Sequence, residues 1–508
     1  MRLGIDFGTT RTRVAAVVEG NYPLITFQAE DGSGTDWYPS LVAGNIDRLH
    51  FGPRAQAVQY DGAWDLLRSI KRLLATGHPH TPVKVGGVET SLLEVLTRFL
   101  SALRQDLLRR SNLDIRPKEW LEVMVGVPAN SSSNQRFLTL EAFRQAGFEV
   151  IGMLNEPSAA GIEYAHRYRD TDMSRRREHV VVYDLGGGTF DVAVICMAGT
   201  RHDVLSSEGI ARLGGDDFDE ILLELALAEE AVAPQVAGVS RARLLSLCRE
   251  AKEAITANSR KVTLDFGQIS PDLSPVMVPV PLFFERCQSL VERSIEATES
   301  AMAAVLGAEE GDVPGLASVY LVGGACELPL LARVLRERFG RRVRRSPYPS
   351  AATAIGLAIA ADEGSGYVLQ ERFSRHFGVW REGEAGVMIT FDPIFAKGTP
   401  LPKPGEPPLT AQRQYRPVHN VGRFRFLECS ALGEAREPAG DVLSWEEAVF
   451  PFDPALVGRP RLDRVRVERS RAVEAYMAEE TYRCDAAGVI EVTITNLTTG
   501  YSKSYRVR

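Results

Sequence analysis

The chain has 508 residues, of which 44% are hydrophobic and 25% charged, and its formal net charge is −7. This length predicts about three compact units, and the acidic balance argues against nucleic acid as a main partner. No run of about 18 apolar residues predicts a membrane span. The N-terminus lacks a signal-peptide pattern and the six cysteines are scattered, so we expect a cytoplasmic protein without a disulfide framework.

The chain opens on an apolar segment that leads into the sequence Gly4–Thr10, and a second run of strand formers follows. This pattern predicts a β-hairpin with a glycine and threonine turn. Gly8, Thr9 and Thr10 would offer backbone and hydroxyl donors to a phosphate. Asp6 would repel that phosphate unless a cation lay between them, so it predicts a hydrated Mg²⁺.

A helix is predicted over Ser91–Arg109, where Ser91 and Glu94 form a capping box before an apolar stripe. A strand at Val123–Val127 and a helix from about residue 134 to 146 follow. Alternating strands and helices continue to about residue 365. They predict an α/β architecture for this long first segment.

A second version of the opening pattern occupies Tyr183–Asp191, again between two runs of strand formers, and Asp184 takes the place of Asp6. Its turn residues are Gly186, Gly187, Gly188 and Thr189. One copy would be weak evidence, because a turn with Asp and Gly is usually only a turn. Two copies, each opening a comparable half of one segment, predict two facing loops that clamp a nucleotide polyphosphate.

The composition changes after Gly364–Gly366, which has the character of a linker. Short alternating segments such as Val465–Val467 and Val489–Ile494 then replace the helical periodicity, and Pro400–Pro408 is too rich in proline for a central strand. We predict a β-sandwich of about 135 residues. The expected organisation is a domain over residues 1–365, a linker over 366–371 and a β-domain over 372–508.

The internal duplication resembles the actin-like ATPase superfamily, and further motifs resemble the seventy-kilodalton heat-shock chaperones of the DnaK type. The motifs are Trp64–Leu74, Val125–Ala129 with Gln135 and Arg136, Leu154–Ala160, Leu213–Asp219, and Leu321–Gly324. In the tail, Phe395–Thr399 and Tyr482–Gly500 resemble parts of the peptide-binding sandwich. The resemblance implies an actin-like fold of two duplicated lobes followed by a β-sandwich, here without the family's helical lid.

The resemblance also implies a role for each matching residue. Lys71 would place a charge on the γ-phosphate and position the attacking water, and Glu156, Asp191 and Thr189 would orient that water. Asp6 and Asp184 would hold Mg²⁺, with K⁺ near these aspartates. ATP or ADP would contact, besides the two turns, Gly214, Gly215, Lys252, Thr256, Gly323 and Gly324. Pro128 and Arg136 would form an allosteric switch.

The adenosine side departs from the family pattern. Glu327 stands where the family has an arginine that packs on the base, and Arg249 stands where the family has a glutamate. These two residues predict a reversed ion pair across the cleft. Ser350 replaces an aspartate of the family, so base recognition and nucleotide affinity are the altered properties.

The resulting expectation is an ATP-dependent chaperone, a monomer or weak dimer, that hydrolyses Mg-ATP slowly and binds unfolded or extended polypeptides. A co-chaperone and a nucleotide-exchange factor would be its partners. The main alternative is a nucleotide-gated scaffold with little or no ATPase activity that serves a dedicated protein partner. An actin-fold small-molecule kinase and a polymerising cytoskeletal protein are weaker alternatives.

Overall fold

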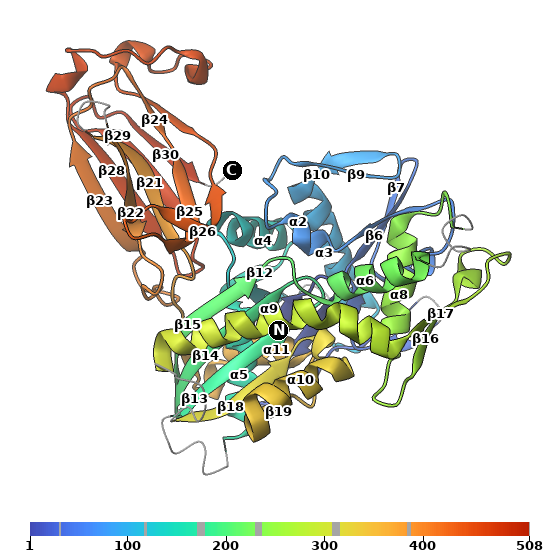
Figure 1. The fold of residues 1–508 in the computed structure, drawn as a ribbon. Coiled ribbons are helices and arrows are strands. Elements are labelled where there is room, and N and C mark those ends of the chain that lie inside the picture. The colour runs from blue at the N-terminus through green and yellow to red at the C-terminus, as the bar shows by residue number, and fades with distance from the viewer. Residues whose placement is uncertain are drawn as a thin grey trace. The chain divides into compact units, whose positions relative to one another are not determined.

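The computed structural model describes residues 1–29, 32–115, 119–169, 178–228, 236–306, 315–383 and 388–506. By their internal contacts the residues divide into two units. Unit 1 comprises Met1–Asn130 and Leu138–Leu369, and unit 2 comprises Ser131–Phe137 and Gln370–Arg508. Unit 1 is mixed α/β and unit 2 consists mainly of strands (Figure 1).

Two central sheets of unit 1 share one plan, with the strand orders β12-β11-β1-β2-β5 and β19-β18-β13-β14-β15-β20. In each sheet an antiparallel hairpin, β1–β2 or β13–β14, is extended on one side by parallel strands. The first sheet contains β1 (Arg2–Phe7), β2 (Arg11–Ala16), β5 (Tyr38–Pro39), β11 (Glu122–Val127) and β12 (Glu149–Asn155). The second contains β13 (Glu178–Leu185), β14 (Phe190–Ala198), β15 (Arg201–Ile210), β18 (Leu316–Val322), β19 (Val343–Arg345) and β20 (Val368–Gln370). The predicted duplication is therefore a duplication of sheet topology.

The two predicted hairpins are confirmed, and their registers correspond. Asp6 lies opposite Arg13 in the first hairpin, and Asp184 lies opposite Asp191 in the second. In each hairpin one further pair, Phe7–Thr12 or Leu185–Phe190, separates these residues from the glycine turn. Residues directly opposite on antiparallel strands have neighbouring side chains, so equivalent positions of the two halves carry different neighbours.

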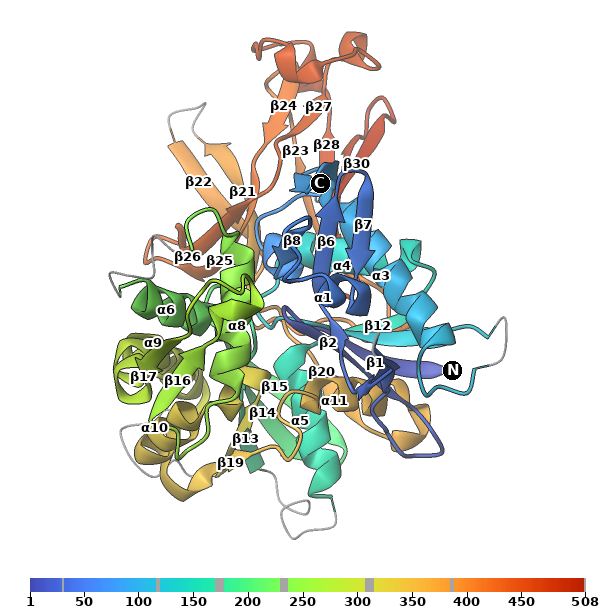
Figure 2. The same cartoon turned by 90° about the vertical axis from the view of Figure 1, so that its right-hand side faces the viewer.

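Helices α5 (Glu156–Arg167) and α11 (Ala352–Ala361) pack against each other between the two sheets, as the rotated view in Figure 2 also shows. Glycines allow this close layering. A Cβ on Gly356 would lie 1.8 Å from the carbonyl oxygen of Ala159, and a Cβ on Gly4 would lie 2.2 Å from the backbone nitrogen of Ala358. The approach of α11 to α5 and to β1 fixes the spacing of the two halves.

The remaining helices of unit 1 surround the sheets. The helix predicted from Ser91 is α3, which begins at Leu92, and Ser91 caps it by accepting the backbone N–H of Glu94 at 3.2 Å. The others are α1 (Pro53–Ala57), α2 (Ile70–Leu73), α6 (Gly215–Leu227), α8 (Arg241–Glu253), α9 (Val280–Leu306) and α10 (Pro329–Phe339). In the described part of the chain, no helix is long and apolar enough to cross a membrane.

Smaller β-elements complete unit 1. They are β3 (Phe27–Gln28), β4 (Gly34–Thr35), β6 (Leu41–Asn45), β7 (Arg48–Phe51), β8 (Asp65–Arg68), β9 (Pro82–Val85), β10 (Val88–Ser91), β16 (Lys261–Leu264) and β17 (Val276–Pro279). Each half has its own large apolar core, one around Phe99 and one around Phe283, both fully buried. Burial of these side chains is the main favourable contribution to the stability of unit 1.

Unit 2 has two four-stranded antiparallel sheets, ordered β22-β21-β25-β26 and β23-β28-β29-β30, and a pair β24–β27. It also includes the start of helix α4 (Ser133–Gln145). Its strands are β21 (His376–Gly383), β22 (Met388–Phe395), β23 (Leu409–Tyr415), β24 (Val421–Phe424), β25 (Phe426–Leu432), β26 (Pro438–Ser444), β27 (Ala448–Pro451), β28 (Ala478–Cys484), β29 (Ile490–Asn496) and β30 (Ser502–Arg506). An aromatic core that includes Phe377, Phe426 and Tyr482 joins the sheets, as a β-sandwich requires.

One predicted strand of the tail is wrong and another is confirmed. Val465–Val467 forms no strand; it follows the 3₁₀ turn Leu462–Arg464 and is largely exposed, so its alternation has no sheet face to bury. The predicted strand at Val489–Ile494 is β29, whose residues alternate between buried and partly buried. The turn before β29 closes through a hydrogen bond from the N–H of Gly488 to the carbonyl of Asp485 at 2.9 Å.

Candidate nucleotide site

The two glycine turns of unit 1 face each other in direct contact. A Cβ on Gly187 would lie 2.3 Å from Oγ1 of Thr10, and a Cβ on Gly188 would lie 2.5 Å from Oγ1 of Thr9. Such distances are shorter than real Cβ contacts, so glycine at these positions lets the threonine turn approach the second loop. The geometry supplies what a polyphosphate clamp needs, namely backbone and hydroxyl donors from both sides.

Two further glycine segments close around the second turn. Gly215 donates its N–H to the carbonyl of Gly186 at 2.9 Å, and a Cβ on Gly214 would lie 2.7 Å from backbone atoms of Gly187. Gly323 has a φ of +87°, and a Cβ there would meet the carbonyl oxygen of Leu185 at 2.3 Å. Both segments therefore approach the loop through backbone that only glycine allows.

One cavity of unit 1 collects most of the residues singled out in the sequence. Its lining includes Asp6, Gly8, Thr9, Thr10, Lys71, Glu156, Asp184, Gly186, Gly187, Thr189, Gly215, Lys252, Gly323 and Gly324. Gly188, Gly214 and Asp191 are not among the lining residues. Gly188 approaches Thr9, Gly214 approaches Gly187, and Asp191 lies opposite Asp184 on the neighbouring strand. Thr256 is not among the lining residues; it is exposed and hydrogen-bonded to Ser259.

The catalytic candidates Lys71 and Glu156 form a buried ion pair. Lys71 lies in the short helix α2, which follows Ser69 in a left-handed conformation, and Glu156 begins helix α5. Burial lowers the pKa of Lys71, but the charges of Glu156 and Asp6 more than offset this effect, so the pKa is raised. The ammonium therefore stays charged beside the cavity, ready to meet another anion.

The motif that contains Lys71 also ties the two halves together. Arg72 donates to the carbonyl of Gly188 at 2.9 Å, and Arg68 pairs with Asp219 at 3.1 Å. Asp219 in turn lies 2.6 Å from the ammonium of Lys252. Arg68 and Asp219 are nearly buried, so this motif positions the base end of the cavity as well as Lys71.

Three carboxylates lie close together at the cavity: Asp184 and Asp191 are buried and Asp6 is partly buried. Burial, and next the charge of Glu156, raise the pKa of Asp6 and of Asp191 to about 7 and the pKa of Asp184 well above its ordinary range. One oxygen of Asp191 accepts the backbone N–H of Ala129 at 2.8 Å. These raised pKa values mean that the carboxylates lack sufficient positive charge, which a divalent cation would supply.

The residues present fit Mg²⁺ bound together with a nucleotide. The described residues hold no group of three or more His, Cys, Asp or Glu side chains arranged for a metal. Asp6 and Asp184 are hard oxygen donors near the ends of β1 and β13, the strands that lead into the facing turns. Mg²⁺ characteristically uses one or two carboxylates with phosphate oxygens and water.

The base end contains charged side chains that sequence reasoning missed or misplaced. Arg249 lines the cavity, whereas Glu327 is exposed and absent from its wall, and no ion pair joins these two described residues. The predicted pairing is therefore wrong. Glu253 instead pairs with Arg11, whose guanidinium lies 4.6 Å from the ring centre of Trp37.

Arg11 and Arg13 were missed altogether, although the sequence contains a signal for them. They alternate on strand β2 directly after the threonine turn, and both line the cavity. Positive residues so close to a phosphate turn were available as candidates on charge alone.

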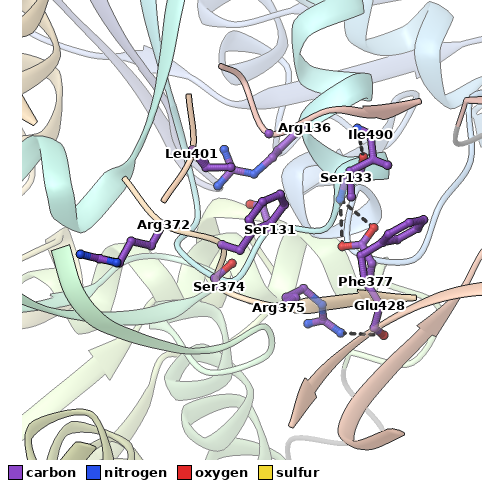
Figure 3. A pocket seen from close by; sticks show the side chains of 12 residues that line it. Ser131, Ser133, Arg136, Arg372, Ser374, Arg375, Phe377, Leu401, Glu428 and Ile490 are labelled. Atoms are coloured by element: carbon purple, nitrogen blue, oxygen red, sulfur yellow. Dashed lines mark hydrogen bonds between the residues drawn. The ribbon is translucent and has the colours of Figure 1, made fainter. Parts of the chain in front are cut away.

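The allosteric candidates fall in different units. Pro128 follows strand β11 in unit 1, whereas Arg136 belongs to unit 2, where it donates to the carbonyl of Ala487 at 3.1 Å. Figure 3 shows the surrounding pocket of unit 2, in which Ser133 donates its backbone N–H to both oxygens of Glu428 at 3.1 Å. The hydroxyl of Ser133 accepts the N–H of Ile490 at 2.9 Å. The first turn of α4 is thus bonded to the β-sandwich.

Comparison with known proteins gives the family of the chain. The family model described as Hsp70 protein matches residues 2–372. The chain belongs to the Hsp70 family. The chaperone protein HscA homologs of Pseudomonas fluorescens (strain SBW25) and Pseudomonas aeruginosa (strain LESB58) are 27% and 30% identical over the whole chain and 78% of their own length. The chaperone protein DnaK of Mycoplasmopsis pulmonis (strain UAB CTIP) is 29% identical over 70% of the chain and 57% of its own length.

Membership of the Hsp70 family confirms the expected fold class, an actin-like ATPase fold followed by a β-sandwich. It also makes the chain an ATP-dependent chaperone of the Hsp70 type, for which ATP or ADP and Mg²⁺ are the cofactors.

Proposed function

We propose that this Hsp70-type chain binds Mg-ATP in the cavity of unit 1, hydrolyses it slowly, and couples the nucleotide state to the capture of unfolded or extended polypeptide by unit 2. The facing glycine turns, with the buried Lys71–Glu156 pair beside them, are the observation that carries this proposal. Phosphoryl transfer to water needs positioning and neutralised charge more than covalent chemistry. This arrangement offers both.

The proposed roles follow the geometry. Backbone N–H groups and hydroxyls of the turns, including Thr9, Thr10 and Thr189, bind the phosphates, and Asp6 and Asp184 hold the Mg²⁺. The ammonium of Lys71 neutralises charge at the terminal phosphate. Glu156 holds this ammonium in place and, with Asp191, orients the attacking water.

The base end makes the remaining contacts to the nucleotide. We propose that Lys252, Gly215, Gly323 and Gly324 of the cavity wall make these contacts. Thr256 contributes least of the residues assigned to it, because it lies outside that wall.

Potassium is the finer part of the proposed cofactor set. Asp184 and Asp191 lie opposite each other on adjacent strands, and like charges at such positions repel. A monovalent cation beside this pair would lower that repulsion. We therefore place the expected K⁺ on the side of the second hairpin.

Coupling is proposed to run through Pro128 and Arg136, which lie on one short stretch of chain, and through the linker over residues 366–371. The N–H of Val368 donates to the carbonyl of Thr200 at 2.9 Å, so the linker begins as an edge strand of unit 1. We propose residues 1–365 as the ATPase domain and 372–508 as the client-binding domain, in a cytoplasmic monomer or weak dimer. A co-chaperone and an exchange factor would act on the ATPase domain.

A peptide titration with the full chain tests the coupling. Fluorescence anisotropy of a labelled, extended apolar peptide is measured without nucleotide, with Mg-ADP and with Mg-ATP. We expect weaker binding in Mg-ATP, by about tenfold, which corresponds to 1.4 kcal/mol of coupling. The variant Arg136→Ala should reduce this difference in peptide affinity, while the affinity of the nucleotide site for Mg-ADP stays unchanged. Equal affinity in all three states would refute the coupling.

The altered base end favours a second candidate, a nucleotide-gated scaffold with little turnover that serves one protein partner. Arg249 in the cavity wall and the exposed Glu327 are the specific observations. Calorimetry with ATP and ADP beside an ATPase assay separates the two, since the scaffold binds nucleotide without hydrolysing it.

A further inference from the structure

The duplicated hairpins differ in one electrostatic feature at equivalent positions. Asp184 has a second carboxylate, Asp191, opposite it on the neighbouring strand. Asp6 has Arg13 opposite it instead. The register is the same in both halves, so Arg13 occupies in the first half the place that Asp191 occupies in the second.

Arg13 is held rigidly at this place. It is 6% exposed, and its Nη1 donates to Oδ2 of Asp36 at 2.6 Å and to the carbonyl of Asp36 at 3.2 Å. Its Nη2 donates to the hydroxyl of Ser350 at 2.8 Å. Ser350 is the residue that stands in place of the family's aspartate, so at this position a neutral hydroxyl meets the guanidinium.

The guanidinium of Arg13 has one donor without a partner, and its positive charge is only partly compensated. Its Nε is buried and has no hydrogen-bond partner, although the residue lines the nucleotide cavity. Asp36 is the one carboxylate paired with it among the described residues, and half of the Asp36 side chain is exposed. Water screens an exposed charge far better than a buried one. The positive charge of Arg13 therefore acts mainly toward the interior, where it stabilises the ionised form of Asp6.

We propose that Arg13 is a built-in counter-cation of the nucleotide site, which takes the place of a bound monovalent cation beside Asp6 and offers Nε to the polyphosphate. The second half has no such residue opposite Asp184, so it retains the need for a cation from solution. This inference rests on the proposed function of the cavity. According to this inference, only the half that contains Asp184 requires a monovalent cation from solution.

The test is the dependence of Mg-ADP affinity on potassium. Isothermal calorimetry is performed with the full chain at several KCl concentrations, with choline chloride keeping the ionic strength constant. The slope of log affinity against log [K⁺] counts the cations taken up with the nucleotide. The slope should increase by about one in Arg13→Gln relative to wild type, because the lost charge is replaced by one more ion. Arg13→Lys should keep the wild-type slope.

Arg11→Gln is the matched control, because it removes the same charge from the same strand and also from the cavity wall. It should leave the slope unchanged. An unchanged slope in Arg13→Gln, or an equal increase in both glutamine variants, would overturn the inference. If wild type binds no Mg-ADP in any salt, the proposed function itself fails; if it binds and only the slopes disagree, the proposed function stands.

A second measurement needs no variant. Crystals of the wild-type protein with Mg-ADP are soaked in thallous acetate, since Tl⁺ replaces K⁺ and is seen by its anomalous scattering. The expected peak lies beside Asp184 and Asp191, with none beside Asp6. A Tl⁺ peak in contact with Asp6 would overturn the inference even if Arg13→Gln failed to fold.

Discussion

The two ends of the nucleotide cavity are built in different ways. At the phosphate end, glycine backbone makes the close contacts: Gly187 and Gly188 meet the threonine turn, and Gly214 meets Gly187, at distances that leave no room for a Cβ. At the base end, charged side chains form the wall, including Arg11, Arg249 and Glu253. A wall of backbone tolerates almost no substitution, whereas a wall of side chains can change its charge without changing the fold. This difference is the physical reason to expect departures from the family pattern, such as Arg249, at the base end rather than at the phosphate end.

The largest expected effect separates binding from hydrolysis at the phosphate end. Lys71→Ala removes the buried ammonium beside Glu156 and should lower single-turnover ATP hydrolysis by at least about 100-fold, as the loss of a preorganised charge does elsewhere. Mg-ADP affinity, measured by calorimetry, should fall far less, because backbone donors hold the phosphates. Lys84→Ala, at an exposed position, is the control and should leave both values unchanged. Hydrolysis that survives in Lys71→Ala would reject the role given to Lys71.

The phosphate end should also make the stability of the nucleotide-free protein depend on pH. Burial raises the pKa of Asp191 to about 7 from an ordinary value of 3.8. A raised acid pKa stabilises the folded state below pH 4, and this contribution is lost as the pH rises through 7, by up to about 1.4 kcal/mol per pH unit. The melting temperature of unit 1 should therefore fall from pH 5 to pH 8.

Asp191→Asn provides the comparison for that series, because the amide cannot ionise. Its melting temperature should fall less over the same pH range, and Mg-ADP should flatten the profile of the wild type by supplying positive charge. Scanning calorimetry at four pH values measures both effects. Parallel profiles for wild type and Asp191→Asn would contradict the assignment of this titration to the buried carboxylates.

The contrast between backbone contacts and side-chain contacts also decides how much could be predicted from the sequence. The glycine turns were found because backbone approach leaves a signature of glycine that survives in one sequence, and Asp6 and Asp184 follow directly from it. The charged base end was misjudged because side-chain pairing depends on rotamers and distances. Arg249 and Glu327 have opposite charges but point to different surroundings, whereas Arg11 and Glu253 meet although nothing in their spacing indicates it.

The fold of the tail shows a similar limit. Strand β29 was predicted because its alternation matches one buried face, but Val465–Val467 has the same alternation without a partner strand. Period alone cannot distinguish these cases. Nor did any local signal indicate that Ser131–Phe137 has its contacts within unit 2, since the bonds of Ser133 to Glu428 and Ile490 join residues far apart in the sequence.

The smallest expected effect lies at the base end, where it limits how much the Arg11–Glu253 pair can contribute to nucleotide binding. Arg11 and Glu253 connect the two halves, but their side chains remain 31% and 37% exposed. Exposed ion pairs contribute about 0.2–1 kcal/mol, so Glu253→Gln should accelerate Mg-ADP release by no more than about fivefold. Stopped-flow fluorescence with a labelled ADP measures this rate.

Salt distinguishes an ion pair at the mouth of the cavity from a direct contact with the base. Screening weakens exposed charge pairs, so the difference between wild type and Glu253→Gln should disappear near 1 M NaCl. Arg11→Gln should accelerate release by the same factor, and the double variant should add nothing further, because both changes break one bond. If the faster release persists at high salt, or if its factor doubles in the double variant, Glu253 contacts the nucleotide itself. The charged side chains of the base end would then take part in nucleotide binding.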